Sequence, residues 1–335
     1  MKKALITGGM GFIGSFIARQ LIEEGTVDTV VLLDHFGRYI SPLREEYYDY
    51  TKYRFTGIEG SIVLERGDTR NYSVAQQIVY RHDPEFIVHL AALPLAKLDN
   101  LTPEEACEGT VVSTSNLLHA VAWAREQGKQ ALRRFVYASS SMVYGDFKAD
   151  VAEEDSHPTY PKEPYGTMKL AGENVTRGLT NFYGLEHAIV RPSAVYGPTD
   201  MNRRVSQIYV EKALRGEVLK VFGEDEKLDF TYVKDIANGF ILAATHPGGA
   251  NQTFNITTGK AQRLLDYVLE LKNLFPDLRY EVVPRDAFRP KRGTLSIDKA
   301  RRLMGYEPAY DLARGVAEYV DFVRRANPEL ARREA

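Results

Sequence analysis

The chain contains short apolar runs separated by longer amphipathic segments. The apolar runs show no alternation of polar and apolar positions, which is typical of strands buried on both faces of a parallel sheet. We assign six strands on this basis, at residues 4–7, 29–34, 61–68, 86–91, 134–140 and 187–193. Because helix-like segments lie between these strands, the pattern predicts an α/β fold with a Rossmann-like, doubly wound parallel sheet.

Three amphipathic segments give the clearest helix signals. The first begins after Gly11 and ends at Gly25, a residue suited to the end of a helix. The second spans 102–128, where Thr102 and Glu105 have the spacing of a capping box. The third spans 164–183 and begins with a proline, as many helices do. These helices would connect the strands through right-handed crossovers.

The composition of the chain and the length of its loops change after about residue 195. Loops become longer and richer in glycine, proline and charge, although 230–244 and 252–259 again read as core elements. We therefore expect a Rossmann domain over 1–190, to which segments near 229–258 return. A smaller C-terminal substrate-binding lobe would occupy 191–335. A chain of 335 residues is long enough to bury a core of this size.

Composition excludes several classes of protein. Charged residues make up 26% and the net charge is −2, without blocks of like charge, so we expect no nucleic-acid or membrane partner. No apolar run approaches the roughly 18–20 residues of a membrane helix, and glycines interrupt the N-terminal run too early for a signal peptide. The single cysteine, Cys107, excludes an internal disulfide and a cysteine-based zinc site. We expect a cytoplasmic protein without a metal.

A glycine-rich turn, "TGGMGFIG", follows the first predicted strand and opens the first helix. Gly8 would permit a tight turn, Gly11 would let a pyrophosphate approach, and Gly14 would let helix and strand pack closely. The free N–H groups at the start of that helix favour an anion. In this context the spacing predicts a dinucleotide site.

An acidic residue ends the second predicted strand. Asp34 lies 20 residues beyond Gly14, where a carboxylate can accept hydrogen bonds from the adenosine ribose. A 2′-phosphate would be repelled there, so this position favours NAD over NADP. The alternative is that Asp34 only caps a loop.

The spacing Tyr-x-x-x-Lys occurs three times, at Tyr48, Tyr144 and Tyr165. Tyr48 lies in a polar, aromatic stretch that we interpret as a solvated face, and Gly145 predicts a turn after Tyr144. Only Tyr165 and Lys169 lie in a predicted helix that follows a hydroxyl-rich strand end, Ser139 to Ser141. A phenol with a pKa near 10 is a weak base, but a nearby ammonium lowers that pKa. We therefore predict that Lys169, together with the positively charged nicotinamide ring of a bound cofactor, acidifies Tyr165.

Several further motifs agree with one family. "TGGMGFIG" at 7–14, "HLAA" at 89–92, "SSSMVYG" at 139–145, "PYGTMK" at 164–169, "RPSAVYGP" at 191–198 and "DFTYVKD" at 229–235 occur in this order. The chain resembles the extended short-chain dehydrogenases/reductases of the nucleotide-sugar epimerase/dehydratase group, from the N-terminus to about residue 320. The resemblance implies bound NAD, a nucleoside-diphosphate sugar as substrate, and a homodimer.

The resemblance also implies roles for individual residues. Tyr165 corresponds to the catalytic base, Lys169 to its ribose-binding partner, and Ser140 to the serine or threonine beside them. His89 is either a contact of the cofactor or a satisfied core histidine. The implied cofactor contacts are Gly8, Gly11, Phe12, Ile13, Gly14, Asp34, His35, Asp68, Thr69, Leu90, Ala91, Ala92, Tyr165, Lys169 and Pro192.

Departures from the family pattern narrow the reaction. Dehydratases of this family carry Asp-Glu where this chain has Ser141 and Met142, so 4,6-dehydration is disfavoured. Ala194 and Leu228 replace an asparagine and an arginine that normally contact the diphosphate. We expect Ser140, Ser141, Arg204 and Arg289 to contact the substrate. The arginines would replace the missing diphosphate contacts, because guanidinium groups suit phosphate oxygens. Arg203 and Arg292 are further candidates.

These observations lead to two hypotheses about the reaction. The first is a nucleotide-sugar 4-epimerase that oxidises C4 transiently, with Tyr165 as base. The second is a 4-dehydrogenase or 4-ketosugar reductase with net redox turnover, which would use the same residues.

Overall fold

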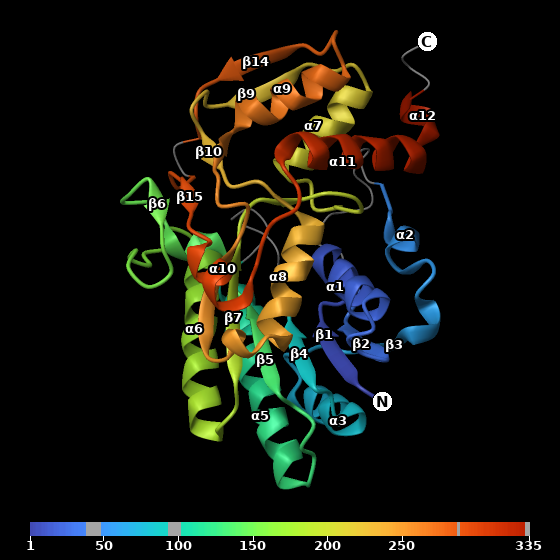
Figure 1. Cartoon of the computed structure of the whole chain (residues 1–335), viewed down its shortest axis with the longest axis vertical. Coiled ribbons are helices and arrows are strands. Elements are labelled where there is room, and N and C mark those ends of the chain that lie inside the picture. The colour runs from blue at the N-terminus through green and yellow to red at the C-terminus, as the bar shows by residue number, and fades with distance from the viewer. Residues whose placement is uncertain (38–47, 93–101, 287–288, 332–335) are drawn as a thin grey trace.

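A seven-stranded parallel sheet forms the centre of the molecule (Figure 1). The computed structural model describes residues 1–37, 48–92, 102–286 and 289–331. The strand order is β12-β7-β5-β4-β1-β2-β3, which confirms the predicted doubly wound α/β fold. Its strands are β1 (Lys3–Thr7), β2 (Thr29–Asp34), β3 (Ile62–Arg66), β4 (Phe86–His89), β5 (Arg134–Ala138), β7 (His187–Pro192) and β12 (Gln252–Ile256).

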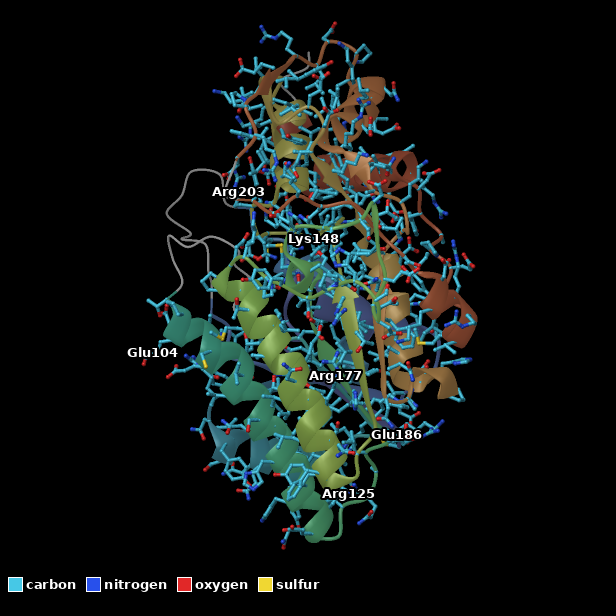
Figure 2. All side chains as sticks on the ribbon, turned by 90° about the vertical axis from the view of Figure 1, so that its left-hand side faces the viewer. Glu104, Arg125, Lys148, Arg177, Glu186 and Arg203 are labelled. Carbon is cyan, nitrogen blue, oxygen red and sulfur yellow. The ribbon has the colours of Figure 1, made fainter. Side chains whose placement is uncertain are left out.

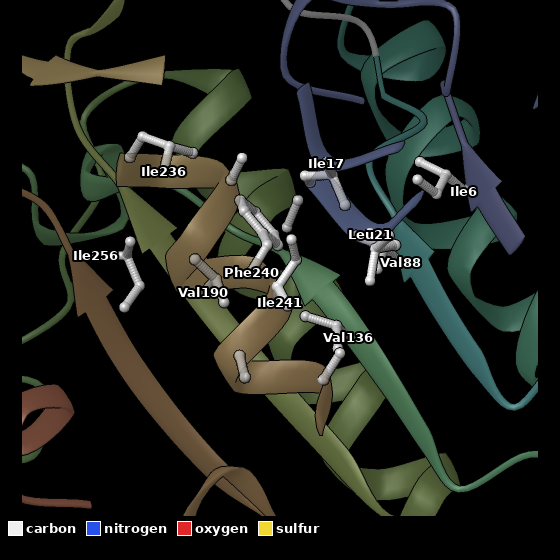
Figure 3. Packing of buried hydrophobic residues seen from close by; sticks show 14 of the residues in the cluster. Ile6, Ile17, Leu21, Val88, Val136, Val190, Ile236, Phe240, Ile241 and Ile256 are labelled. Atoms are coloured by element: carbon white, nitrogen blue, oxygen red, sulfur yellow. The ribbon is translucent and has the colours of Figure 1, made fainter. Parts of the chain in front are cut away.

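Helices cover both faces of the sheet and bury its apolar side chains. On one face lie α1 (Phe12–Glu23), α8 (Val233–Thr245) and α10 (Asp298–Met304). Figure 3 shows Ile17 of α1 and Phe240 of α8 in this cluster, together with Val88 and Val136 of the sheet. The other face packs against α3 (Tyr72–His82), α5 (Ser113–Glu126) and α6 (Pro164–Tyr183). Burial on both faces explains why most strands read as unbroken apolar runs.

The expectation for the strand at 61–68 was wrong in one respect. β3 lies at the edge of the sheet, and its Val63 and Leu64 side chains are 37% and 50% exposed. A continuous apolar run therefore did not indicate burial on both faces here, because the position of a strand in the sheet depends on contacts distant in sequence.

The predicted helix at 102–128 is divided into three parts. Thr102 and Glu105 form the expected capping box at the start of α4 (Pro103–Cys107). A π-helical turn (Glu108–Val112) then leads into α5. The third predicted helix has the observed bounds of α6, and Gly184 ends it in the left-handed conformation.

The region after residue 191 contributes to the apolar cluster of Figure 3, called here the first core, and to a second apolar cluster, the second core. Within 229–258, α8 packs against α1 and β12 pairs with β7 of the sheet. The second core lies in the upper part of Figure 1. Its elements are α7 (Val205–Leu214), β9 (Leu219–Phe222), α9 (Leu264–Leu274), β14 (Tyr280–Val283), α11 (Leu312–Ala326) and α12 (Pro328–Ala331). In contrast, α10 packs in the first core, although it lies within the segment expected to form the lobe.

Short elements join these parts. One is the helix α2 (Thr51–Phe55). Three are two-stranded pairs: β6 (Val151–Ala152) with β15 (Thr294–Leu295), β8 (Val195–Tyr196) with β11 (Thr231–Tyr232), and β10 (Lys227–Leu228) with β13 (Gln262–Arg263). The others are the 3₁₀ turns η1 (Glu59–Ser61), η4 (Ser141–Tyr144) and η5 (Pro247–Gly249). Within the described ranges, every helix is too short or too polar to cross a bilayer.

Candidate active site

A cavity of about 1490 Å³ lies at the carboxyl ends of the sheet strands. β1 pairs with β2 on one side and with β4 on the other, so the direction of the winding reverses there. Open α/β sheets bind ligands at such a switch point. The cavity is lined by all the predicted cofactor contacts and by Ser140, Ser141, Arg204 and Arg289.

The glycine turn after β1 is too tightly packed against backbone atoms to accept side chains at Gly8 and Gly11. Gly8 has a φ of +68°, and a Cβ there would lie 3.0 Å from the backbone nitrogen of Ala91. A Cβ on Gly11 would lie 2.9 Å from the carbonyl oxygen of Gly8. Gly11 also begins α1 without a side-chain cap, and residues 12–14 line the cavity. The start of α1 can therefore hold an anion, and the turn fits a pyrophosphate.

Carboxylates lie at the ends of β2 and β3. Asp34 accepts hydrogen bonds from the backbone N–H groups of Met10 (3.1 Å) and Phe36 (2.8 Å), so it does brace a loop. A carboxylate has further acceptor sites, so the contact with a ribose stays a prediction. Burial alone would raise the pKa of Asp68, but hydrogen bonds from Arg70 hold it below its usual range.

His89 is a satisfied core histidine. Its Nδ1 lies 2.6 Å from the hydroxyl oxygen of Thr7, and its Nε2 lies 3.1 Å from that of Thr114. Burial, with a smaller contribution from the charge of Lys169, lowers the pKa of His89 to about 3. The neutral ring therefore braces the end of β4, after which Leu90 and Ala91 reach the cavity.

The predicted catalytic residues come together from two elements. Ser140 follows β5 and hydrogen-bonds the phenol of Tyr165, which lies in the first turn of α6. One turn later, Lys169 places its Nζ 5.8 Å from the centre of the Tyr165 ring. Its ammonium donates to the carbonyl oxygen of Ala138 at 2.7 Å. The three side chains thus lie together in the cavity, while their catalytic roles stay predictions.

Burial dominates the titration of this group in the protein without its cofactor. Burial raises the pKa of Tyr165, and the charge of Arg204 and the hydrogen bond with Ser140 oppose part of that rise. Burial also lowers the pKa of Lys169 to about 7. The predicted acidification of Tyr165 by Lys169 requires the charged nicotinamide beside it and stays a prediction.

A buried ion pair anchors α6 to the sheet. Glu173 lies one turn after Lys169 and accepts two hydrogen bonds from Arg191 of β7, at 2.8 and 2.7 Å. Ser139, adjacent to Ser140, donates to the same carboxylate at 2.5 Å. Arg177, labelled on α6 in Figure 2, donates to it at 2.8 Å. These contacts connect the serine-rich strand end to the helix that carries Tyr165.

The four candidate arginines differ in what they contact. Arg204 donates to the carbonyl oxygen of Val195 at 3.1 Å and lies 5.8 Å from the ring centre of Phe12. Arg203 is bound to buried Glu211, which makes a phosphate contact less favourable. Arg289 is mainly exposed and contacts Asp286 at 3.3 Å.

Arg292 is the fourth candidate, and its Nε atom is buried without a hydrogen-bond partner in the described structure. Like Arg204 and Arg289, it lines the cavity. Ala194 and Leu228 also line the cavity and offer no polar side chain, which agrees with the predicted change in how the diphosphate is held.

The other two Tyr-x-x-x-Lys tyrosines have structural roles. Tyr144 ends a 3₁₀ turn before Gly145, as predicted, and its hydroxyl donates to Asn255 at 2.8 Å. The solvated face expected around Tyr48 was wrong. Tyr48 packs against the second core and stacks on Tyr50, which is only 1% exposed.

Two residues of the cavity were missed by the sequence analysis. Arg54 donates to the carbonyl oxygens of Met10 (2.6 Å) and Thr199 (2.7 Å), and it directly follows the stretch interpreted as solvated. Glu163 lines the cavity directly before α6. Its position next to Pro164 and Tyr165 was the available signal.

A family model, the NAD dependent epimerase/dehydratase family, matches residues 4–257. The chain belongs to this family. It is an enzyme, and its cofactor is NAD, which agrees with the glycine turn at the start of α1.

Relatives from this family cover nearly the whole chain. The UDP-glucose 4-epimerase of Mycolicibacterium smegmatis is 30% identical, over 96% of this chain and 98% of the relative. The dTDP-glucose 4,6-dehydratase 1 of Escherichia coli is 28% identical, over 96% and 92%. The structure of the Thermotoga maritima UDP-glucose 4-epimerase with UDP-glucose has a TM-score of 0.82 at 25% identity, over 96% and 99%. The family therefore includes epimerases and dehydratases similar to this chain.

Proposed function

We propose that this enzyme is a nucleotide-sugar 4-epimerase. The observation that carries the proposal is the joint placement of Ser140, Tyr165 and Lys169 in one cavity with the glycine turn. No acidic residue occupies positions 141 and 142, where the dehydratases carry Asp-Glu. Relatives named as UDP-glucose 4-epimerases support the same activity.

The residues of the first core would hold the cofactor. Backbone N–H groups at the start of α1 would bind the pyrophosphate, and Asp34 would accept hydrogen bonds from a ribose. Bound NAD supplies the hydride acceptor for C4 of the sugar and the donor that returns the hydride.

Tyr165 would act as base and then as acid. Its phenolate oxygen takes the proton of the C4 hydroxyl and later returns it to the same oxygen, while the Ser140 hydroxyl holds that oxygen in place. Arg204 and Ser140 favour the phenolate, and burial disfavours it. Because the sugar is held beside these groups, proximity contributes much of the rate.

Positions 141 and 142 do not support elimination. Ser141 donates its hydroxyl to Ser193 at 3.1 Å, and Met142 is a buried apolar residue at the cavity wall. Neither side chain can serve as the acid or base that removal of water between C5 and C6 requires. This is the reason for preferring epimerisation over the reaction of the dehydratase relatives.

Substitution of Tyr165 by phenylalanine tests the proposal. Wild-type enzyme should invert C4 of a UDP- or dTDP-hexose, followed by proton NMR, and Tyr165→Phe should lower kcat by about 10²–10⁴ because the proton acceptor is lost. Tyr160→Phe is the matched control, since Tyr160 is 79% exposed, and it should retain activity. Retained activity in Tyr165→Phe would refute the assigned base. Stoichiometric NADH or a released ketosugar would instead indicate the net redox reaction.

Three other expectations stay predictions. They are the division into a domain over 1–190 and a lobe over 191–335, the homodimer that the resemblance implies, and the cytoplasmic location. Light scattering of the purified protein would measure the oligomeric state.

A further inference from the structure

Glu163 lines the candidate active site and has a buried carboxylate oxygen without a hydrogen-bond partner among the described residues. It is the N-cap residue of α6, yet its side chain makes no capping hydrogen bond. The unpaired atom is Oε2. Leaving a buried acceptor unpaired destabilises the folded protein, so such an atom requires an explanation.

A donor with the same property lines the same cavity. The Nε atom of Arg292 is buried and lacks a hydrogen-bond partner in the part of the chain that the structure describes. Glu163 and Arg292 lie close enough for each charge to shift the pKa of the other, but no ion pair within 4.0 Å joins these two described residues. The same cavity is therefore lined by one residue with an unpaired acceptor and one with an unpaired donor, which suits a ligand that has both kinds of group.

The position of Glu163 relative to the base indicates which part of the ligand it would contact. Glu163 lies two residues before Tyr165, and its charge is one of the influences that raise the pKa of Tyr165. Because Tyr165 would act on the sugar, the carboxylate lies at the sugar end of the cavity.

We propose that Glu163 and Arg292 form a sugar-recognition subsite that selects neutral hexoses over uronic acids. Glu163 Oε2 accepts a hydrogen bond from a sugar hydroxyl, and Arg292 Nε donates to an oxygen of the sugar or its phosphate. This assignment rests on the proposed function, because it takes the substrate to be a nucleotide sugar.

The selectivity follows from charge. A hydroxyl group satisfies the carboxylate, whereas the carboxylate of a uronic acid brings a second negative charge into a partly desolvated space. Arg289 and Arg292 lie near Glu163 and offset part of this repulsion, and Asp286 adds to it. Replacing Glu163 by glutamine keeps the shape and removes the charge, so discrimination against the acidic sugar should fall.

Steady-state kinetics with UDP-glucose and UDP-glucuronic acid test the subsite. For wild type, we expect kcat/KM for C4 inversion to be at least tenfold higher with UDP-glucose. Glu163→Gln should reduce this ratio at least fivefold, mainly through a lower KM for UDP-glucuronic acid. Glu153→Gln makes the same change at an exposed carboxylate outside the cavity and should leave the ratio unchanged. A ratio within twofold of wild type in folded Glu163→Gln would overturn the proposal.

A binding measurement separates this proposal from the proposed function. Thermal shifts of the NAD-bound wild type and Glu163→Gln are compared with UDP, UDP-glucose and UDP-glucuronic acid, and with dTDP and dTDP-glucose. A sugar-dependent shift that Glu163→Gln alters selectively supports the subsite, even if no sugar is inverted at C4 and the epimerase proposal fails. If neither sugar adds to the shift that its nucleoside diphosphate alone produces, the subsite is refuted. Absence of any shift refutes it as well.

Discussion

Lys169 shows how burial can oppose the chemistry expected of a side chain. It is 4% exposed, and its ammonium donates a hydrogen bond to the carbonyl oxygen of Ala138. Desolvation disfavours the charged form, which is why its pKa falls to about 7. At neutral pH, Lys169 is therefore charged in only part of the molecules. Its expected role beside Tyr165 requires bound ligands that stabilise the ammonium.

We therefore predict that Lys169→Met makes the ligand-free protein more stable while abolishing most activity. The pKa of a lysine is near 10.4 in the unfolded chain and about 7 in this fold, so the unfolded chain binds more protons between these values. The stability of the wild type then rises with pH across this window. The advantage of Lys169→Met should be largest below pH 7, at up to about 5 kcal/mol, and should shrink as the pH rises toward 10.

Urea denaturation at pH 6.5 and pH 9.5 measures this difference. Lys260→Met, at an exposed lysine, is the control and should show neither effect. Equal stability of Lys169→Met and wild type at pH 6.5 would show that the buried ammonium carries no such cost.

The helix α6 is seated directly on the elements that carry Ser140. A Cβ on Gly166 would lie 2.6 Å from the carbonyl oxygen of Met142 in η4, and one on Gly172 would lie 2.1 Å from the hydroxyl oxygen of Tyr137 in β5. These close approaches leave little freedom for the helix to shift. Together with the Glu173 ion pair, they hold the base in register with the serine.

Two glycines of α6 offer a matched test of this seating. Gly172→Ala should lower the free energy of unfolding by about 1–3 kcal/mol, because its methyl group would push the helix away from β5. The displaced Tyr165 should then lower kcat more than it changes KM. Gly178→Ala is the same substitution at a position with open space, and it should stabilise the protein by up to about 1 kcal/mol.

Denaturation and kinetics of the two variants are compared side by side. Loss of stability in both variants, or unchanged kcat in Gly172→Ala, would contradict the proposed seating.

At the scale of the whole molecule, the cavity lies between elements of two apolar clusters, the one around α1 and α8 and the one around α7, α9 and α11. The segment around α2 connects them. Tyr50 accepts a hydrogen bond from Asn327 at 2.7 Å and packs against Phe322 of α11. Arg54 joins the glycine turn to the loop that precedes α7 through Met10 and Thr199. One short helix thus holds the cofactor turn against the substrate side.

Arg54→Met should weaken both folding and cofactor binding. The hydrogen bonds from this charged, buried donor to Met10 and Thr199 are lost, so we expect a loss of about 2–4 kcal/mol in the free energy of unfolding. Since Met10 belongs to the glycine turn, the Kd for NAD should rise about tenfold, measured by calorimetry. Arg81→Gln, at an exposed arginine distant from the cavity, should change neither quantity. An unchanged Kd in Arg54→Met would show that the link does not support the turn.

Local signals were sufficient for the elements that carry the predicted chemistry. The proline at the start of α6 and Gly184 at its end define a helix through contacts within a few residues, and the spacing of Gly8, Gly11 and Gly14 reflects one turn. The parallel sheet was also predictable, because strands covered on both faces need apolar side chains throughout.

Contacts between distant segments could not be read in the same way. The exposed edge position of β3, the Arg54 link and the unpaired buried atoms of Glu163 and Arg292 depend on how separate elements pack. The titration of Lys169 depends on how completely water is excluded around it. The order of residues therefore specified the local elements and the types of chemical group. Folding alone established which groups lost water and which charges came together, because desolvation and Coulomb interaction depend on distance in space.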